Sequence, residues 1–190
     1  NVMLLSNKGD TTKEIVSKIK AILEGLPFFM KPGVVKKEVM KIFFDNGCKL
    51  HSQNTTAKAA IGFAIHLLYI DEFAHIAENL KKSFYENVIP TISASKIARI
   101  IITSTPNKFD LFHNIYVAAE DGQNQYFPIR VDWWEVPGRD EDWKKRMIAD
   151  LGSESAFNEQ YGNQFINDDS LLLGSEEMKR LKDAVQEYEF

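Results

Sequence analysis

The segment Gly62–Phe73 reads GFAIHLLYIDEF, and it decides the fold. Its stretch Ile65–Ile70 is mostly apolar, which predicts a buried strand, and two acids, Asp71 and Glu72, follow directly. Such a strand delivers both carboxylates to the same end of a sheet. The pattern alone is weakly specific, because a strand can also end in two solvated acids at a loop.

A second buried strand is predicted at Ile97–Ile102, and it ends in three consecutive hydroxyl residues, Thr103, Ser104 and Thr105. Small hydroxyl groups at a strand end can sense a terminal phosphate, although a turn capped by Ser or Thr before a proline has the same appearance. Acids on one strand end and hydroxyls on the next are together typical of a nucleotide-dependent motor. In that interpretation the first acid holds Mg²⁺, usually through water, and the second orients or deprotonates the attacking water.

Strands and helices alternate along the rest of the chain. Further strands are predicted at Val2–Leu5, on both sides of the Asn46-Gly47 turn within residues 39–52, and at Tyr126–Val131. Helices are predicted after a capping box of Thr11 and Glu14, from about Ala77, at Phe109–Ala119 and from roughly Asp140. This alternation predicts an α/β fold, a mainly parallel sheet with helices on both faces, whose ligands bind at the carboxyl ends of the strands.

Several segments resemble the large terminase subunit of tailed bacteriophages, the ATPase that drives DNA into the capsid. The resemblance runs nearly end to end through NKGDTTKEIVSKIKAILEGLPFFMKPGVV (7–35), IFFDNGCKLHS (42–52), LLYIDEFAHI (67–76), RIIITSTPNKFDLFHNIY (99–116) and ESAFNEQYGNQF (154–165). It implies a P-loop NTPase fold of the additional-strand, catalytic-glutamate type, built as a three-layer sandwich. It also implies ATP and Mg²⁺ as cofactors, with Asp71 as the magnesium residue, Glu72 as the catalytic residue and Thr103, Ser104 and Thr105 as nucleotide-sensing residues.

The phosphate loop of that family lies upstream of the strand that Val2–Leu5 resembles. A phosphate loop needs G-x-x-x-x-G-K-[ST], and no Gly-Lys pair occurs anywhere in the 190 residues. Lys8–Thr12 is a deviant alternative, because its lysine precedes Gly9. We therefore expect an ATPase region without its first strand and phosphate loop, with an incomplete sheet, an apolar groove beside the strand that ends in Asp71, and little activity by itself.

The resemblance also implies a domain division and a set of partners. Residues 1–170 are expected to form the partial ATPase domain, and residues 171–190 a helix or linker toward a nuclease domain. The implied partners are double-stranded DNA, the portal protein, the small terminase subunit, and either an oligomeric ring on the capsid or a second chain that supplies the phosphate loop. An inactive terminase fragment that acts as a binding module and a DEAD-type helicase relative stay open as alternatives, although Ala74 fills the fourth position of the helicase box.

Composition and charge narrow the class of protein. Residues 1–60 carry ten Lys or Arg and five Asp or Glu, whereas residues 61–190 carry thirteen and twenty-two. The net charge of −4 argues against a protein that coats nucleic acid, although the basic first third can face a polyanion. No apolar run is long enough for a membrane span, and Cys48 is the only cysteine, so a reducing compartment, the host cytoplasm, is expected.

Overall fold

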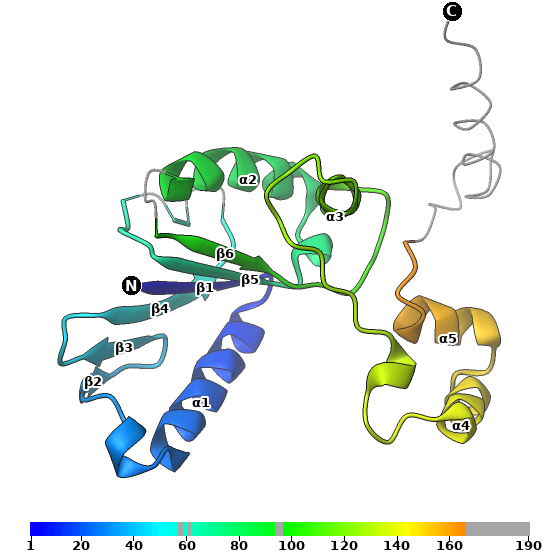
Figure 1. The fold of residues 1–190 in the computed structure, drawn as a ribbon, viewed down its shortest axis with the longest axis horizontal. Helices are drawn as coiled ribbons and strands as arrows, with labels where there is room; N and C mark the ends of the chain where they lie inside the picture. Colours follow the sequence, from blue (N-terminus) through cyan, green and yellow to red (C-terminus); the bar gives the residue numbers. More distant parts are fainter. Residues whose placement is uncertain (57–58, 61, 94–96, 166–190) are drawn as a thin grey trace, which may run out of the picture. The chain divides into compact units, whose positions relative to one another are not determined.

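The computed structural model describes residues 1–56, 59–60, 62–93 and 97–165 (Figure 1). The chain divides into two compact units, Asn1–Ser104 and Thr105–Phe190. The predicted C-terminal helix or linker at 171–190 lies outside the described residues. Its boundary with the region 1–170 therefore stays a prediction.

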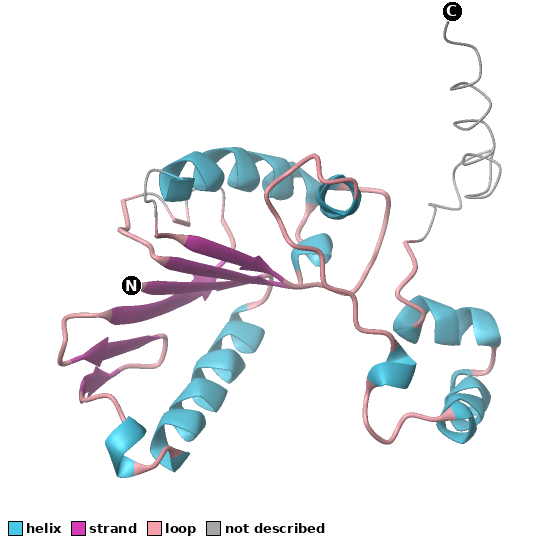
Figure 2. Cartoon of the chain, in the orientation of Figure 1, coloured by secondary structure: helices cyan, strands magenta, loops and turns pink. Residues whose placement is uncertain are grey.

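One sheet forms the centre of the first unit. Its strands are β1 (Val2–Ser6), β2 (Val34–Lys37), β3 (Lys41–Phe44), β4 (Lys49–Asn54), β5 (Leu67–Asp71) and β6 (Arg99–Ile102). Figure 2 shows them as arrows, in the order β2-β3-β4-β1-β5-β6. β4, β1, β5 and β6 run parallel, and β3 pairs antiparallel with both β2 and β4. The predicted mainly parallel sheet is confirmed, with an antiparallel addition at one edge.

Helices cover both faces of this sheet, as the prediction of a three-layer sandwich requires. α1 (Gly9–Gly25) lies on one face and α2 (Glu78–Ser93) on the other (Figure 1). Two short 3₁₀ turns, η1 (Phe28–Met30) and η2 (Phe73–His75), follow α1 and β5. None of the described helices combines the length and the hydropathy that crossing a membrane would take.

Apolar side chains on both faces of the sheet hold the layers together. On the α1 side, Val16 packs in a cluster with Leu4, Ile42 and Leu50. The residues of β5 alternate between buried and half-buried side chains, and Leu68 and Ile70 are fully buried. Burying one such side chain stabilises the fold by about 1.5–3 kcal/mol. Leu67, Tyr69 and Asp71 therefore point to the α1 side of the sheet, since successive side chains of a strand alternate.

The start of α1 differs from the sequence prediction. The helix begins at Gly9, two residues before the predicted cap, and the capping residue Lys8 makes no side-chain cap bond. The N–H of Thr12 already donates to the Lys8 carbonyl at 3.1 Å, and the Thr12 hydroxyl donates to the same oxygen at 2.9 Å. Thr11 thus lies inside the first turn, where it is no longer a cap.

The hairpin is confirmed at the Asn46-Gly47 turn, where Gly47 adopts a φ of 78°. The N–H of Gly47 donates to the Phe44 carbonyl and closes the turn. A further strand, β2, pairs with β3 and was not predicted. Its residues Val34–Lys37 are mostly exposed, so the sequence carries little apolar alternation to indicate a strand.

The second unit is helical in its described part. It contains α3 (Leu111–Glu120), the short η3 (Trp133–Glu135), α4 (Glu141–Leu151) and α5 (Glu154–Tyr161). Each helix has a side-chain cap: Asp110 for α3, Asp140 for α4 and Ser153 for α5. The rings of Trp133, Trp143, Phe157 and Tyr161 pack together, and Phe157 is fully buried.

The strand predicted at Tyr126–Val131 is wrong. This segment has no regular secondary structure, and no described residue pairs with it in a ladder. Phe127, Ile129 and Val131 are 86%, 73% and 59% exposed, so the alternation that suggested a strand does not point into a core. Pro128 also lacks the N–H that a ladder would use.

Candidate functional site

The carboxyl ends of β5 and β6 lie side by side. The two strands are parallel neighbours, with Ile70 opposite Ile102, and the N–H of Thr103 donates to the Ile70 carbonyl at 2.9 Å. The residues that follow the two strands are therefore held at one edge of the sheet. This is the arrangement that the sequence predicted for the acid pair and the hydroxyl residues.

Asp71 and Thr103 are in direct contact across this edge. The Thr103 hydroxyl lies 3.1 Å from Oδ1 of Asp71. Tyr69 completes a triangle, since its hydroxyl donates to the same Oδ1 at 3.1 Å and lies 2.9 Å from the Thr103 oxygen. Burial raises the pKa of Tyr69 above its usual value, which keeps its hydroxyl a proton donor.

Glu72 occupies an unusual backbone conformation beside this triangle. Its φ of 53° and ψ of 46° are left-handed, a region that costs a non-glycine residue about 1–3 kcal/mol. Its Oε2 is buried without a hydrogen-bond partner and lies 3.5 Å from Nε2 of His75, too long for a good hydrogen bond. Strain and an unsatisfied carboxylate oxygen at one residue are features that cluster at functional sites.

Ser104 joins the coupling segment to the turn that follows Glu72. The N–H of Ala74 donates to the Ser104 hydroxyl at 3.0 Å, and the N–H of Phe73 donates to the Thr103 carbonyl at 3.2 Å. The structure thus places Asp71, Glu72, Thr103 and Ser104 at one sheet edge. Thr105 begins the second unit, and its role stays a prediction from the sequence.

Sequence reasoning missed two polar residues at this edge. Tyr69 lies two positions before Asp71 on the same face of β5, a signal that the period of a strand carries. Ser6 ends β1 directly opposite Asp71, and its hydroxyl is buried without a partner. Ser6 gave no signal, because only the sheet order places it beside β5.

The oxygen atoms at this edge fit a hard cation that is completed by a ligand. Mg²⁺ prefers oxygen, keeps several waters and is held in proteins by one or two carboxylates plus substrate phosphates. Asp71 offers the carboxylate, and the unpartnered Ser6 hydroxyl is a further oxygen at the same edge. Among the described residues no three His, Cys, Asp or Glu side chains gather as a self-sufficient metal site. A cation here would therefore take most of its ligands from phosphate and water.

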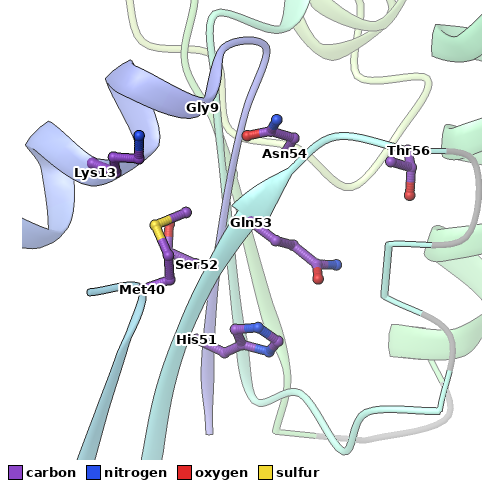
Figure 3. A pocket seen from close by; sticks show the side chains of 8 residues that line it. All are labelled: Gly9, Lys13, Met40, His51, Ser52, Gln53, Asn54 and Thr56. Carbon is purple, nitrogen blue, oxygen red and sulfur yellow. The ribbon is translucent and has the colours of Figure 1, made fainter. Parts of the chain in front are cut away.

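A pocket of about 570 Å³ opens at the start of α1 (Figure 3). Its lining residues are Gly9, Lys13, Met40, His51, Ser52, Gln53, Asn54 and Thr56. None of the predicted site residues lines this pocket. Lys8 and Thr12, the other members of the deviant phosphate-loop alternative, are also absent from its lining.

The edge of the sheet differs from the predicted open groove. The strand that ends in Asp71, β5, has β1 on one side and β6 on the other. Within the described part of the chain it is β6 that has a neighbour on one side only, and its residue Ile101 is 46% exposed. The open edge thus lies one strand further out than expected.

Solved structures with this fold are phage large terminases. The chain is similar to the large terminase ATPase domain of Thermus phage P74-26, with a TM-score of 0.61, 17% sequence identity, and coverage of 87% of this chain and 76% of that one. It is also similar to the HK97 bacteriophage large terminase, with a TM-score of 0.65, 14% identity, and coverage of 86% of this chain and 39% of that one. For the large terminase of a thermophilic bacteriophage in complex with ADP the values are 0.60, 12%, 83% and 39%.

These likenesses and the order of the strands define the class: the protein has a P-loop NTPase-like α/β fold. The family follows from the sequence. The model of the family described as terminase large subunit, T4likevirus-type, N-terminal matches residues 1–179. The chain belongs to this family, and it spans about two fifths of the length of the HK97 large terminase and of the ADP-bound one.

Proposed function

We propose that this chain is the ATP-hydrolysing region of a phage large terminase that moves double-stranded DNA into the procapsid. The observation that carries the proposal is the contact between Asp71 and Thr103, 3.1 Å apart on neighbouring strand ends. Family membership and the likeness to terminase ATPase domains support it. Portal protein, small terminase subunit and a ring of copies are the partners that this role implies.

Each residue of the site has a distinct task in this proposal. Asp71 orients the waters of Mg²⁺, which when bound neutralises charge on the phosphates of ATP. Glu72 accepts a proton from the water that attacks the terminal phosphorus, while the bond from that phosphorus to the bridging oxygen breaks. Thr103, Ser104 and Thr105 pass the loss of the phosphate to the following segment. The bond between Ser104 and the Ala74 N–H supports this, because it joins that segment to the turn after Glu72.

The phosphate loop in this proposal comes from residues outside these 190, because no Gly-Lys pair occurs among them. Another segment of the same protein, or a second chain, supplies it. The open side of β6 offers a place for the strand that precedes such a loop, since an unpaired edge carries N–H and C=O groups that need partners. The chain by itself is then expected to hydrolyse ATP poorly.

The test replaces the proposed base. A polypeptide that carries this chain together with a phosphate-loop segment is assayed for ATP hydrolysis, and Glu72→Gln should lower kcat about 10²–10⁴-fold, since it removes a general base. Glu86→Gln is the matched control, because Glu86 is an exposed carboxylate on α2 away from the site. An unchanged rate in Glu72→Gln refutes the assignment.

A binding module without activity is the second candidate, and the absence of a Gly-Lys pair favours it. Isothermal titration of the 190-residue chain with ATP and Mg²⁺ separates the two functions. Micromolar binding supports the proposed nucleotide site. No binding by the chain, together with no hydrolysis after a phosphate-loop segment is added, supports the binding module.

A further inference from the structure

Tyr69 is in contact with both residues that form the centre of the proposed site. Its hydroxyl lies 3.1 Å from Oδ1 of Asp71 and 2.9 Å from Oγ1 of Thr103, and those two atoms are 3.1 Å apart. The three oxygens thus form a closed triangle that spans β5 and β6. Nothing in the apolar pattern of β5 requires a hydroxyl at this position, and a phenylalanine would fill the same space.

The proton count of the triangle shows what the hydroxyl adds. Tyr69 and Thr103 carry one hydroxyl proton each, and Asp71 as a carboxylate carries none. If Tyr69 donates to Asp71, the Thr103 proton can go to either the Asp71 oxygen or the Tyr69 oxygen. Thr103 therefore keeps a partner on β5 even when the Asp71 carboxylate turns toward another ligand.

The ring of Tyr69 anchors this hydroxyl to the sheet. It packs against the buried cluster that includes Leu4 of β1 and Val16 of α1. Leu4 and Tyr69 are also opposite each other in the β1–β5 register. A hydroxyl on a ring held in this way has little freedom, so its position relative to the ends of β5 and β6 is fixed by the core.

We propose that Tyr69 is a positioning residue that orients the Asp71 carboxylate and keeps Thr103 attached to β5 during the reaction. This inference rests on the proposed function, because it assigns Asp71 to the cation and Thr103 to coupling. Tyr69 acts through these two residues and contacts no reacting atom. Without its hydroxyl, Asp71 would lose one of its two hydroxyl partners, and Thr103 would have only the carboxylate and a long contact of 3.4 Å to the Ile70 carbonyl.

The first arm of the test measures the contact in the 190-residue chain. Tyr69→Phe, Thr103→Val and the double variant are unfolded with urea and followed by far-ultraviolet circular dichroism. A coupled pair should change the unfolding equilibrium by a factor of about 2–12 beyond the product of the single effects, the range for one hydrogen bond. Additive effects overturn the contact. If Thr103→Val does not fold, Thr103→Ser, which retains the hydroxyl, replaces it and should show no loss of coupling relative to the wild type.

The second arm measures the role in the hydrolysing polypeptide that contains this chain. Tyr69→Phe should raise the Mg²⁺ concentration for half-maximal rate about 2–12-fold, as expected for one lost hydrogen bond to the carboxylate. Tyr161→Phe is the matched control, because Tyr161 contacts its neighbours through its ring in the second unit. An unchanged Mg²⁺ dependence in Tyr69→Phe overturns the inference.

The two proposals fail in different ways. If Glu72→Gln retains full activity, the proposed function is wrong, whatever the urea experiment shows. If Glu72→Gln is inactive and Tyr69→Phe has the Mg²⁺ dependence of the wild type, the proposed function stands and the positioning role is wrong. A purely structural role for Tyr69 would lower stability and leave the Mg²⁺ dependence unchanged.

Discussion

Glu72 shows how a single residue can hold strain at a site. Its left-handed backbone at φ 53° turns the chain from the end of β5 into η2. Phe73 and Ala74 directly after it are buried, so the turn cannot relax outward. Conformations of this kind persist where the surrounding structure over-determines them. The strain directs the carboxylate beside Asp71, and function explains why a glycine does not occupy the position.

The prediction at the residue scale is that Glu72→Gly stabilises the chain. Glycine adopts left-handed backbone without the clash of a Cβ atom, so the free energy of unfolding should rise by about 1 kcal/mol. Urea unfolding of the 190-residue chain measures this. Glu86→Gly on the exposed side of α2 is the control and should cost about 1 kcal/mol instead. A loss of stability in Glu72→Gly would show that the backbone is not strained there.

At the scale of elements, a buried lysine connects α2 to the turn after β5. The Lys81 side chain is 2% exposed, and its Nζ donates to the Ala74 carbonyl at 2.9 Å and lies 3.2 Å from Oε2 of Glu78. The Ala74 N–H donates in turn to Ser104. Ala74 is therefore held from both sides, by the first turn of α2 and by the end of β6. This arrangement fixes the turn that carries Glu72.

We expect Lys81→Met to destabilise the chain, because it leaves the Ala74 carbonyl without this donor. The cost of an unsatisfied buried acceptor is about 1–3 kcal/mol. Thermal or urea unfolding is the measurement, and Lys82→Met is the matched control, since the Lys82 side chain is 76% exposed. Equal stability of the two variants would mean that Lys81 does not hold the turn.

At the scale of the whole molecule, the chain consists of two compact units with separate cores. The first is the sheet with α1 and α2, and the second contains the aromatic cluster around Phe157. All three tryptophans, Trp133, Trp134 and Trp143, lie in the second unit. Tryptophan fluorescence therefore reports on that unit alone.

The prediction at this scale is that the two units unfold independently. Phe157→Ala should cost about 3–5 kcal/mol in the second unit, because it empties a fully buried site, and should lower the midpoint of the fluorescence transition. Val16→Ala, a smaller deletion in the core of the first unit, should shift the circular dichroism transition of the sheet and leave the fluorescence midpoint in place. If both variants shift both transitions together, the chain unfolds as one cooperative unit.

Much of the fold and part of the site followed from local signals. The apolar runs of β1, β5 and β6 and the Asn-Gly turn predicted the parallel core of the sheet and its hairpin. The acids after β5 and the hydroxyls after β6 predicted which strand ends meet. The strand at Tyr126–Val131 failed because alternation of apolar residues indicates a strand only where a core receives one face, and here Phe127 and Ile129 face solvent.

The sequence by itself determined the family, the alternation of strands and helices, and the identity of Asp71, Glu72, Thr103 and Ser104 as residues at strand ends. Only the tertiary structure decided that Tyr69 and Ser6 join them, that β6 is the open edge, and that Glu72 is strained. Strand order, cross-strand register and backbone conformation arise from contacts between residues far apart in the chain. A hydroxyl on β1 or a tyrosine in an apolar run therefore acquires its partners only when the sheet is assembled.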